Sequence, residues 1–215
     1  MGSLKRGALI VIEGVDRSGK STQCKKLVES LRNKNLKAEL MNFPDRTTLT
    51  GKLISDYLRD PECTLNDEAI HLLFSANRWE NVDKMKDFLY AGTTVIVDRY
   101  SYSGIAFSSA KKGMDINWCK HPEIGLPKPD LVILLTLSAE AAAKRSGFGE
   151  ERYETKAMQS MVSKVFENLA KQEDNWKIVD ASGSMDEVHS VLLQDILKKI
   201  SEVADSELES LEFLG

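Results

Sequence analysis

The sequence GVDRSGKS, at residues 14–21, carries the strongest structural signal in the chain. It matches the GxxxxGK[ST] pattern in full, and it stands between an apolar run and a segment with helical periodicity. In that context the glycines let backbone N–H groups turn toward phosphate oxygens, and the N-terminus of the following helix adds a favourable dipole. Lys20 is then expected to reach the β- and γ-phosphates of a nucleotide, and the Ser21 hydroxyl is expected to bind Mg²⁺.

Short apolar runs along the rest of the chain predict the fold class. Most of these runs are continuous, which is typical of strands buried on both faces of a parallel sheet. Segments with helical periodicity separate them, so we predict an α/β protein with the P-loop NTPase fold: a five-stranded parallel sheet flanked by helices on both faces. The expected strands are residues 8–12, 38–41, 93–97, 131–137 and 176–179, and the expected helices are residues 21–33, 67–89, 151–175 and 185–203.

Length and charge limit the classes of function. The 215 residues suit a single domain, and the formal net charge is −4. A chain without a net basic balance is not expected to bind a nucleic-acid polymer. The acidic excess is concentrated in residues 200–215, which contain no Lys or Arg. We interpret this acidic tail as a frayed helix end without an assigned function.

The cysteines and the hydropathy predict the compartment. Cys24, Cys63 and Cys119 lie far apart and include no CxxC pair, which argues against a disulfide framework or a zinc site. No apolar run is long enough to span a bilayer, and the N-terminus lacks the apolar core of a signal peptide. We therefore expect a protein that does not associate with membranes and that lies in a reducing compartment. That compartment is expected to be the cytoplasm, and a nuclear pool is compatible with the same observations.

Charged residues follow several of the expected strands. Asp98 and Arg99 follow the third strand, and Arg46 lies just past the second. Because ligands of such folds bind outside the carboxyl ends of the strands, these residues are expected at one edge of the sheet. Asp98 could hold Mg²⁺ directly or through water, and Arg99 offers a planar fork suited to phosphate. Arg46 could bind the phosphate of a second substrate or be an ordinary surface arginine.

Other residues leave two interpretations open. Arg17, inside the phosphate-binding loop, could stabilise a transferring phosphoryl group or simply be solvated. Phe74 and Arg78 share a helix face, so an aromatic ring and a forked donor could together read a base. Spacing alone favours the plainer alternative, with Phe74 in the core and Arg78 on the surface. The loop at 144–155 could close over a nucleotide as a lid or merely connect two helices.

The series of motifs resembles the thymidylate kinases, and in particular their animal and fungal members. The resemblance runs from about residue 6 to about residue 197, nearly the whole chain. It rests on EGVDRSGKST (13–22), FPDR (43–46), LFSANRWE (73–80), VDRY (97–100), GLPKPD (125–130) and ERYE (151–154). Together these motifs are specific, whereas the phosphate-binding loop alone would not separate kinases from GTPases.

The resemblance implies a role for each matching residue. It implies ATP binding by Gly14, Arg17, Ser18, Gly19, Lys20, Ser21, Thr22, Arg145, Ser182 and Gly183. It implies dTMP binding by Asp16, Phe43, Arg46, Phe74, Arg78, Arg99, Ser103, Gly104, Phe107, Tyr153 and Gln159. Catalysis would fall to Lys20, Arg17, Arg99 and Asp98, with Ser21 and Asp98 at Mg²⁺. Phe74 would stack on thymine and Arg78 would bond its carbonyl edge, which reverses the interpretation from spacing alone.

The reaction implied is transfer of the ATP γ-phosphoryl group to dTMP, which gives dTDP and ADP. The resemblance also implies a homodimer. The alternative within enzymes is another P-loop kinase of nucleoside monophosphates or deoxynucleosides. A GTPase-like switch or a nucleotide-binding module without turnover is the alternative outside that class, but the sequence has no NKxD motif to read guanine.

Overall fold

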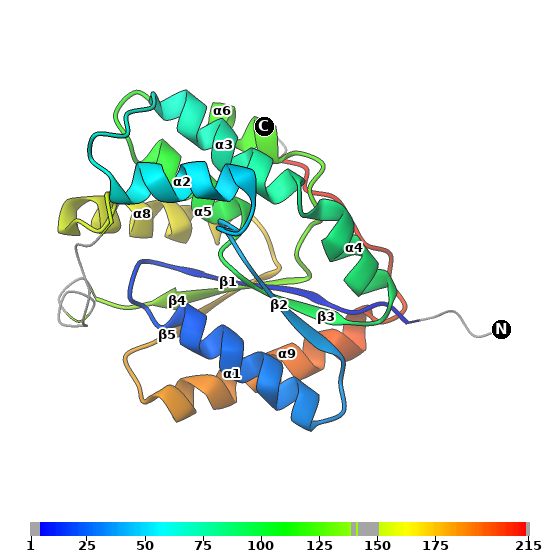
Figure 1. Cartoon of the computed structure of the whole chain (residues 1–215). Helices are drawn as coiled ribbons and strands as arrows, with labels where there is room; N and C mark the ends of the chain where they lie inside the picture. Colours follow the sequence, from blue (N-terminus) through cyan, green and yellow to red (C-terminus); the bar gives the residue numbers. More distant parts are fainter. Residues whose placement is uncertain (1–4, 139–140, 142–150, 214–215) are drawn as a thin grey trace.

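The computed structural model describes residues 5–138, 141 and 151–213. Its centre is a five-stranded sheet with the order β2-β3-β1-β4-β5, in which each neighbouring pair is parallel (Figure 1). The strands are β1 (Leu9–Gly14), β2 (Ala38–Asn42), β3 (Thr94–Asp98), β4 (Leu131–Thr136) and β5 (Trp176–Asp180). All form where apolar runs predict them, so the predicted architecture is confirmed.

The strands are apolar on both faces because helices cover both faces. Side chains alternate along a strand, so Leu9 of β1 packs into the core on one side of the sheet and Ile10 into the core on the other. Helices α1 (Lys20–Asn33) and α9 (Met185–Val203) lie together below the sheet in Figure 1. The opposite face is covered by α4 (Val82–Tyr90), α5 (Ser101–Ser109) and α8 (Lys156–Leu169).

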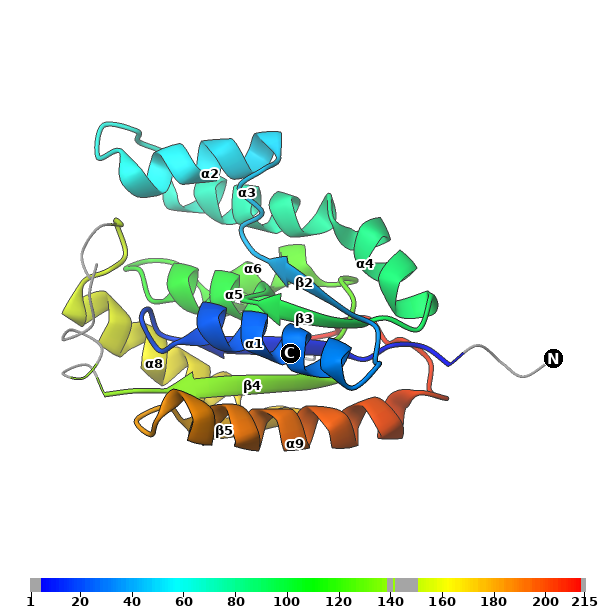
Figure 2. The ribbon, with the colours of Figure 1, turned by 60° about the horizontal axis from the view of Figure 1, so that its bottom comes forward.

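Two helices form a layer farther from the sheet. They are α2 (Leu49–Arg59) and α3 (Asp67–Trp79), which lie side by side at the top of Figure 2. A separate apolar cluster joins them, with Ile54 of α2 and Ile70 of α3 both completely buried. This layer leaves room between itself and the sheet edge for the cavity described below.

The single helix predicted over residues 67–89 is wrong, because the chain breaks between α3 and α4. Asn81 lies at the break, where its side-chain amide donates to the carbonyl of Asn77 at 3.0 Å. An asparagine that bonds backbone groups in this way competes with regular helix geometry. The helix predicted over 151–175 is also shorter, since Thr155 caps the first turn of α8 through Met158 N–H. The periodicity does not reveal α2, α5, α6 (Ile116–Lys120) or the 3₁₀ turn η1 (His121–Glu123).

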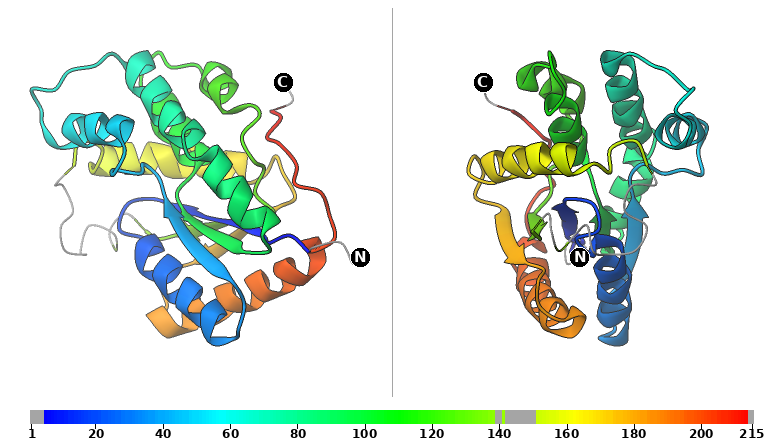
Figure 3. Two further views of the ribbon diagram at one scale, coloured as in Figure 1. Left: turned by 45° about the vertical axis from the view of Figure 1, so that its right-hand side comes forward. Right: turned by 90° about the vertical axis from the view of Figure 1, so that its left-hand side faces the viewer.

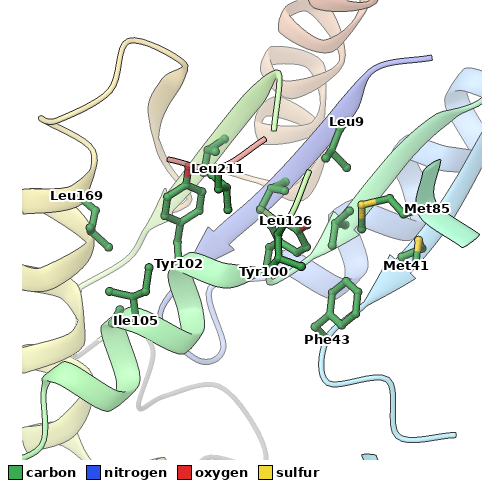
Figure 4. Close-up of a cluster of buried hydrophobic side chains, with 14 of the residues drawn as sticks. Leu9, Met41, Phe43, Met85, Tyr100, Tyr102, Ile105, Leu126, Leu169 and Leu211 are labelled. Carbon is green, nitrogen blue, oxygen red and sulfur yellow. The ribbon is translucent and has the colours of Figure 1, made fainter. Parts of the chain in front are cut away.

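The acidic tail is not a frayed helix end. After α9 the chain runs extended along the molecule toward α6, as the red segment of Figure 3 shows. Leu211 is 1% exposed and packs in the core beside Tyr102, and its backbone bonds both Gly125 and Leu126 (Figure 4). Phe213 lies under the ammonium of Lys120. The apolar side chains of this segment, between its carboxylates, anchor it to the fold.

No helix in the described part of the chain is long and apolar enough to cross a membrane.

Candidate active site

The phosphate-binding loop joins β1 to α1. Gly14 and Gly19 adopt φ values of 146° and 98°, which side chains other than glycine's rarely allow. The Lys20 ammonium donates to the Val15 carbonyl at 2.7 Å and lies 3.3 Å from the Ser18 hydroxyl. The loop thus folds around its own lysine, at the point where a phosphate would be bound.

Burial makes Lys20 unusually acidic. Desolvation, with the nearby Arg99 guanidinium, lowers the pKa of Lys20 to about 8, although the Asp16 and Asp98 carboxylates oppose the shift. An anionic ligand beside the ammonium would raise this pKa again, because it favours the charged form.

Ser21 and Asp98 meet at the ends of α1 and β3. The Ser21 hydroxyl donates to a carboxylate oxygen of Asp98. Both offer hard oxygen ligands of the kind that Mg²⁺ takes, usually together with phosphate oxygens and water. In the described ranges no three His, Cys, Asp or Glu side chains cluster as a metal site. A metal at this point would therefore be shared with a bound phosphate.

Arg99 joins the phosphate-binding loop to α5. Its guanidinium donates to the Gly14 carbonyl and to the Ser103 hydroxyl, both at 3.1 Å, and forms an ion pair with Asp16. Gln159 of α8 holds Asp16 from the other side, through a 2.6 Å bond to its carboxylate. Burial alone would raise the pKa of Asp16, but the Arg99 and Lys20 charges outweigh burial and hold that pKa below its usual range.

Glu13 lies beneath this network and is completely buried. One carboxylate oxygen accepts the backbone N–H groups of Tyr100 at 2.9 Å and Ser103 at 3.0 Å, and the other accepts the Ser103 hydroxyl at 2.5 Å. Burial raises the pKa of Glu13, and the Arg99 charge opposes this only in part. Glu13 therefore fixes the first turn of α5, and with it Ser103, against the end of β1.

Two further arginines of the cavity are paired with carboxylates that precede α8. Arg17 lies 3.1 Å from Glu154, and Arg46 lies 2.7 Å from Glu151. Each of these carboxylates occupies the kind of position that a phosphate oxygen would take beside a guanidinium. Phosphate binding at either arginine would have to compete with an internal ion pair.

The far end of the cavity is apolar and aromatic. Phe74 and Arg78 of α3 both line the cavity, together with Phe107 of α5. Tyr153 lies 5.8 Å from Phe107, ring centre to ring centre, and its hydroxyl donates to that of Tyr57 at 3.2 Å. An aromatic slot with one forked donor is suited to a planar base.

One cavity of about 740 Å³ contains most of the predicted site residues. Of these, it is lined by Asp16, Arg17, Gly19, Lys20, Ser21, Thr22, Phe43, Arg46, Phe74, Arg78, Asp98, Arg99, Ser103, Gly104, Phe107 and Tyr153. Gly14, Ser18 and Gln159 lie behind this lining and bond to it. Ser182 and Gly183 are not part of the lining; Ser182 bonds Asp180 in the turn after β5. Arg145 lies outside the described residues.

Sequence reasoning assigned no role to several residues of this site. Glu13, Glu151 and Glu154 belong to the quoted motifs, but nothing in their spacing shows which donor each carboxylate meets. Asn77 bonds the loop that carries Arg46, where it accepts from the backbone N–H of Asp45 at 2.7 Å. Its place three residues after Phe74 gives no signal of this contact.

The site combines a phosphate-binding loop with two arginines outside that loop, Arg46 and Arg99, and with an aromatic slot suited to a base. This combination defines a P-loop nucleotide kinase. The sequence model of the thymidylate kinase family matches residues 12–192. The chain is 50% identical to the thymidylate kinase of Danio rerio over 206 residues, which is 95% of this chain and 96% of that protein. It is 50% identical to the Homo sapiens thymidylate kinase over 208 residues, or 95% and 98% of the two chains.

A solved structure of thymidylate kinase from Candida albicans superposes with a TM-score of 0.89 at 41% identity, over 96% of this chain and 99% of that one. The chain belongs to the thymidylate kinase family.

The shifted pKa of Lys20 predicts a specific pH dependence. Below about pH 8 the ammonium is charged; as pH rises through its pKa in the free protein, the positive charge available to an anionic ligand of the phosphate-binding loop is lost. We expect kcat/KM for ATP to fall above about pH 8, while kcat holds to higher pH because bound phosphates raise the pKa of Lys20. Steady-state kinetics between pH 6 and 10 measure both; a kcat/KM that stays flat throughout contradicts the assignment.

Proposed function

We propose that this cavity holds ATP and dTMP end to end. The phosphate-binding loop takes the phosphates of ATP, the aromatic slot takes thymine, and the two sets of phosphates meet between Arg17 and Arg99. The supporting observation is that Arg17, Lys20 and Arg99 line the same cavity as Phe74 and Arg78. A nucleotide-binding module without turnover would have no need for the second set of basic groups.

The proposed reaction is in-line transfer. An oxygen of the dTMP phosphate attacks the γ-phosphorus of ATP, its bond to phosphorus forms, and the bond to the β-phosphate oxygen breaks to release ADP. The acceptor phosphate is already ionised, so no strong general base is needed. Catalysis then consists of positioning and charge neutralisation, to which Lys20, Arg17 and Arg99 contribute.

Mg²⁺ is proposed as the cofactor of ATP. Ser21 and Asp98 would hold it, directly or through water, because their oxygens already meet beside Lys20. Held there, Mg²⁺ would supply positive charge against the charge that develops on the phosphates.

The acceptor nucleotide would use the other half of the cavity. Arg46 and Arg99 would bind the dTMP phosphate, so Arg46 would exchange Glu151 for that phosphate. Asp16, held by Gln159, would accept the 3′-hydroxyl. Tyr153, supported by Tyr57, would lie at the sugar edge that a ribonucleotide hydroxyl would crowd.

The chain is also proposed to form a homodimer through α2 and α3. Leu49 and Leu53 share one face of α2 and are 80% and 57% exposed, and Leu72 and Trp79 of α3 are 47% and 42% exposed. An apolar surface of this kind is typical of a protein interface.

The location that we propose is the cytoplasm, with a nuclear pool. The free thiols of all three cysteines suit a protein of such a reducing compartment. A tagged chain found in secretory compartments would contradict that location.

Replacing Arg17 tests the proposed mechanism. We expect Arg17→Ala to lower kcat by about 10²–10³, because one group that stabilises transition-state charge is lost. The measurement is ADP release coupled to NADH oxidation, with dTMP as the acceptor. Thymidine should give no turnover in either protein, since a hydroxyl acceptor needs a general base.

Arg32→Ala is the matched control, because Arg32 also forms an ion pair, with Glu39 at 2.9 Å, but lies away from the cavity. Its kcat should equal that of the wild type. An Arg17→Ala enzyme with wild-type kcat contradicts the role of Arg17. Turnover of thymidine but not of dTMP contradicts the proposal that dTMP is the phosphoryl acceptor.

The dimer is tested by mass in solution. Light scattering of the purified chain should give about twice the 24.0 kDa of one chain, and Leu53→Asp should give a monomer because a carboxylate cannot be buried unpaired in an apolar interface. A wild-type mass of one chain rules out the proposed interface.

A further inference from the structure

Arg78 and Glu123 form an ion pair that is buried more deeply than the others in the described part of the chain. Their side chains are 2% and 0% exposed. Arg78 Nε donates to one carboxylate oxygen at 2.7 Å, and Nη2 donates to the other. A forked pair of this kind fixes the plane and the rotation of a guanidinium as well as its position.

Gly104 of α5 completes the setting of this guanidinium. A methyl group at Gly104 would lie 2.5 Å from Nη2 and 3.2 Å from Cζ of Arg78. The guanidinium therefore occupies the space that a side chain at position 104 would need. One edge of Arg78 is held by Glu123, and one face is held against the backbone of α5.

The turn that carries Glu123 is fixed by hydrogen bonds to its neighbouring residues. It is the last residue of η1, and the preceding Pro122 carbonyl accepts from Ser75 Oγ at 3.0 Å and from Trp79 Nε1 at 2.7 Å. Just after it, Gly125 N–H donates to the Leu211 carbonyl of the tail. Helix α3 thus carries Arg78 and also holds the turn that carries its partner.

This arrangement decides which donors reach the cavity. Nε and one hydrogen of Nη2 are committed to Glu123, and Nη1 has no hydrogen-bond partner among the described residues. A guanidinium has donors only. Held in this way, it matches a carbonyl at C4 of a pyrimidine and opposes the amino group that cytosine carries there. A guanidinium free to shift could instead donate to N3 of cytosine, which is an acceptor.

We propose that Glu123, together with Gly104, is a positioning residue that makes the site selective for 4-carbonyl over 4-amino pyrimidine nucleotides. This inference rests on the proposed function, in which Arg78 faces the base. Glu123 touches no reacting atom; it acts through Arg78. A purely structural pair would stabilise the fold without affecting the choice of base.

The test compares kcat/KM for dTMP, dUMP and dCMP. In Glu123→Gln we expect the ratio of dTMP to dCMP to fall by about tenfold or more, because one matched contact is lost and a mismatched one is relieved. The ratio of kcat/KM for dTMP to that for dUMP should stay unchanged, since both nucleotides carry a carbonyl at C4 of the base. Gly104→Ala should lower the first ratio in the same way. Its methyl group meets only the guanidinium end of Arg78 within 3.2 Å, so the side chain rather than the backbone of α5 would shift, and alanine is well tolerated in a helix.

Asp130→Asn is the matched control. Asp130 forms a comparable buried, forked pair with Arg6, at 2.7 Å and 2.8 Å, on a part of the chain that does not line the cavity. Its loss should lower the melting temperature as Glu123→Gln does and should leave both ratios unchanged. Arg78→Lys, which keeps the charge but loses the fork, tests the proposed function separately.

The outcomes distinguish the two claims. Lower dTMP-to-dCMP ratios in Glu123→Gln and Gly104→Ala, with Asp130→Asn unchanged, support the inference. An unchanged ratio in those two variants, with a lower ratio in Arg78→Lys, overturns the inference and leaves the role of Arg78 intact. An unchanged ratio in Arg78→Lys as well overturns that role and the inference with it. If Glu123→Gln does not fold, the ratio in Gly104→Ala decides.

Discussion

The geometry of the site depends on the hydrogen bonds of one buried carboxylate, that of Glu13. It lies next to the last residue of the central strand β1, and both of its oxygens are bound to the start of α5 through Tyr100 and Ser103. Ser103 in turn accepts from Arg99, whose guanidinium reaches back to the phosphate-binding loop and to Asp16. One side chain therefore sets the distance between the loop proposed for ATP and the helix proposed for dTMP. Its bond to the Tyr100 N–H joins two residues 87 positions apart in the sequence, beside the contacts that Arg99 makes with Gly14 and Asp16.

The arginines of the cavity are neutralised internally by carboxylates. Arg17 and Arg46 are paired with Glu154 and Glu151, and Arg99 is paired with Asp16. This explains how a chain of net charge −4 could bind two polyanions as proposed: the positive charges are local, and phosphates would exchange with carboxylates already there. The internal ion pairs also keep the arginines ordered before a substrate arrives, which lowers the entropic cost of binding.

The parts that the sequence predicts are those with local signals. The five strands, α1, α9 and the phosphate-binding loop follow from apolar runs and a motif within a few residues. The break at Asn81 and the partner of Arg78 depend on contacts between distant residues, which periodicity does not contain. Spacing alone favoured a surface position for Arg78, yet it is 2% exposed. The tail held a usable signal, since Leu211 interrupts its acidic pattern and proves to be buried.

The most direct test of this role of Glu13 is Glu13→Gln, an isosteric change that removes the charge. Burial raises the pKa of Glu13, so the folded state disfavours its ionised form and the neutral amide should cost little stability. The amide nitrogen would donate to the Ser103 hydroxyl where the carboxylate oxygen accepts, so the Ser103 hydroxyl hydrogen loses its acceptor and the hydroxyl has to turn beside Arg99. We expect kcat/KM for dTMP to fall by about tenfold or more at an unchanged melting temperature. Wild-type kcat/KM in the folded variant would show that Glu13 does not join the two halves of the site.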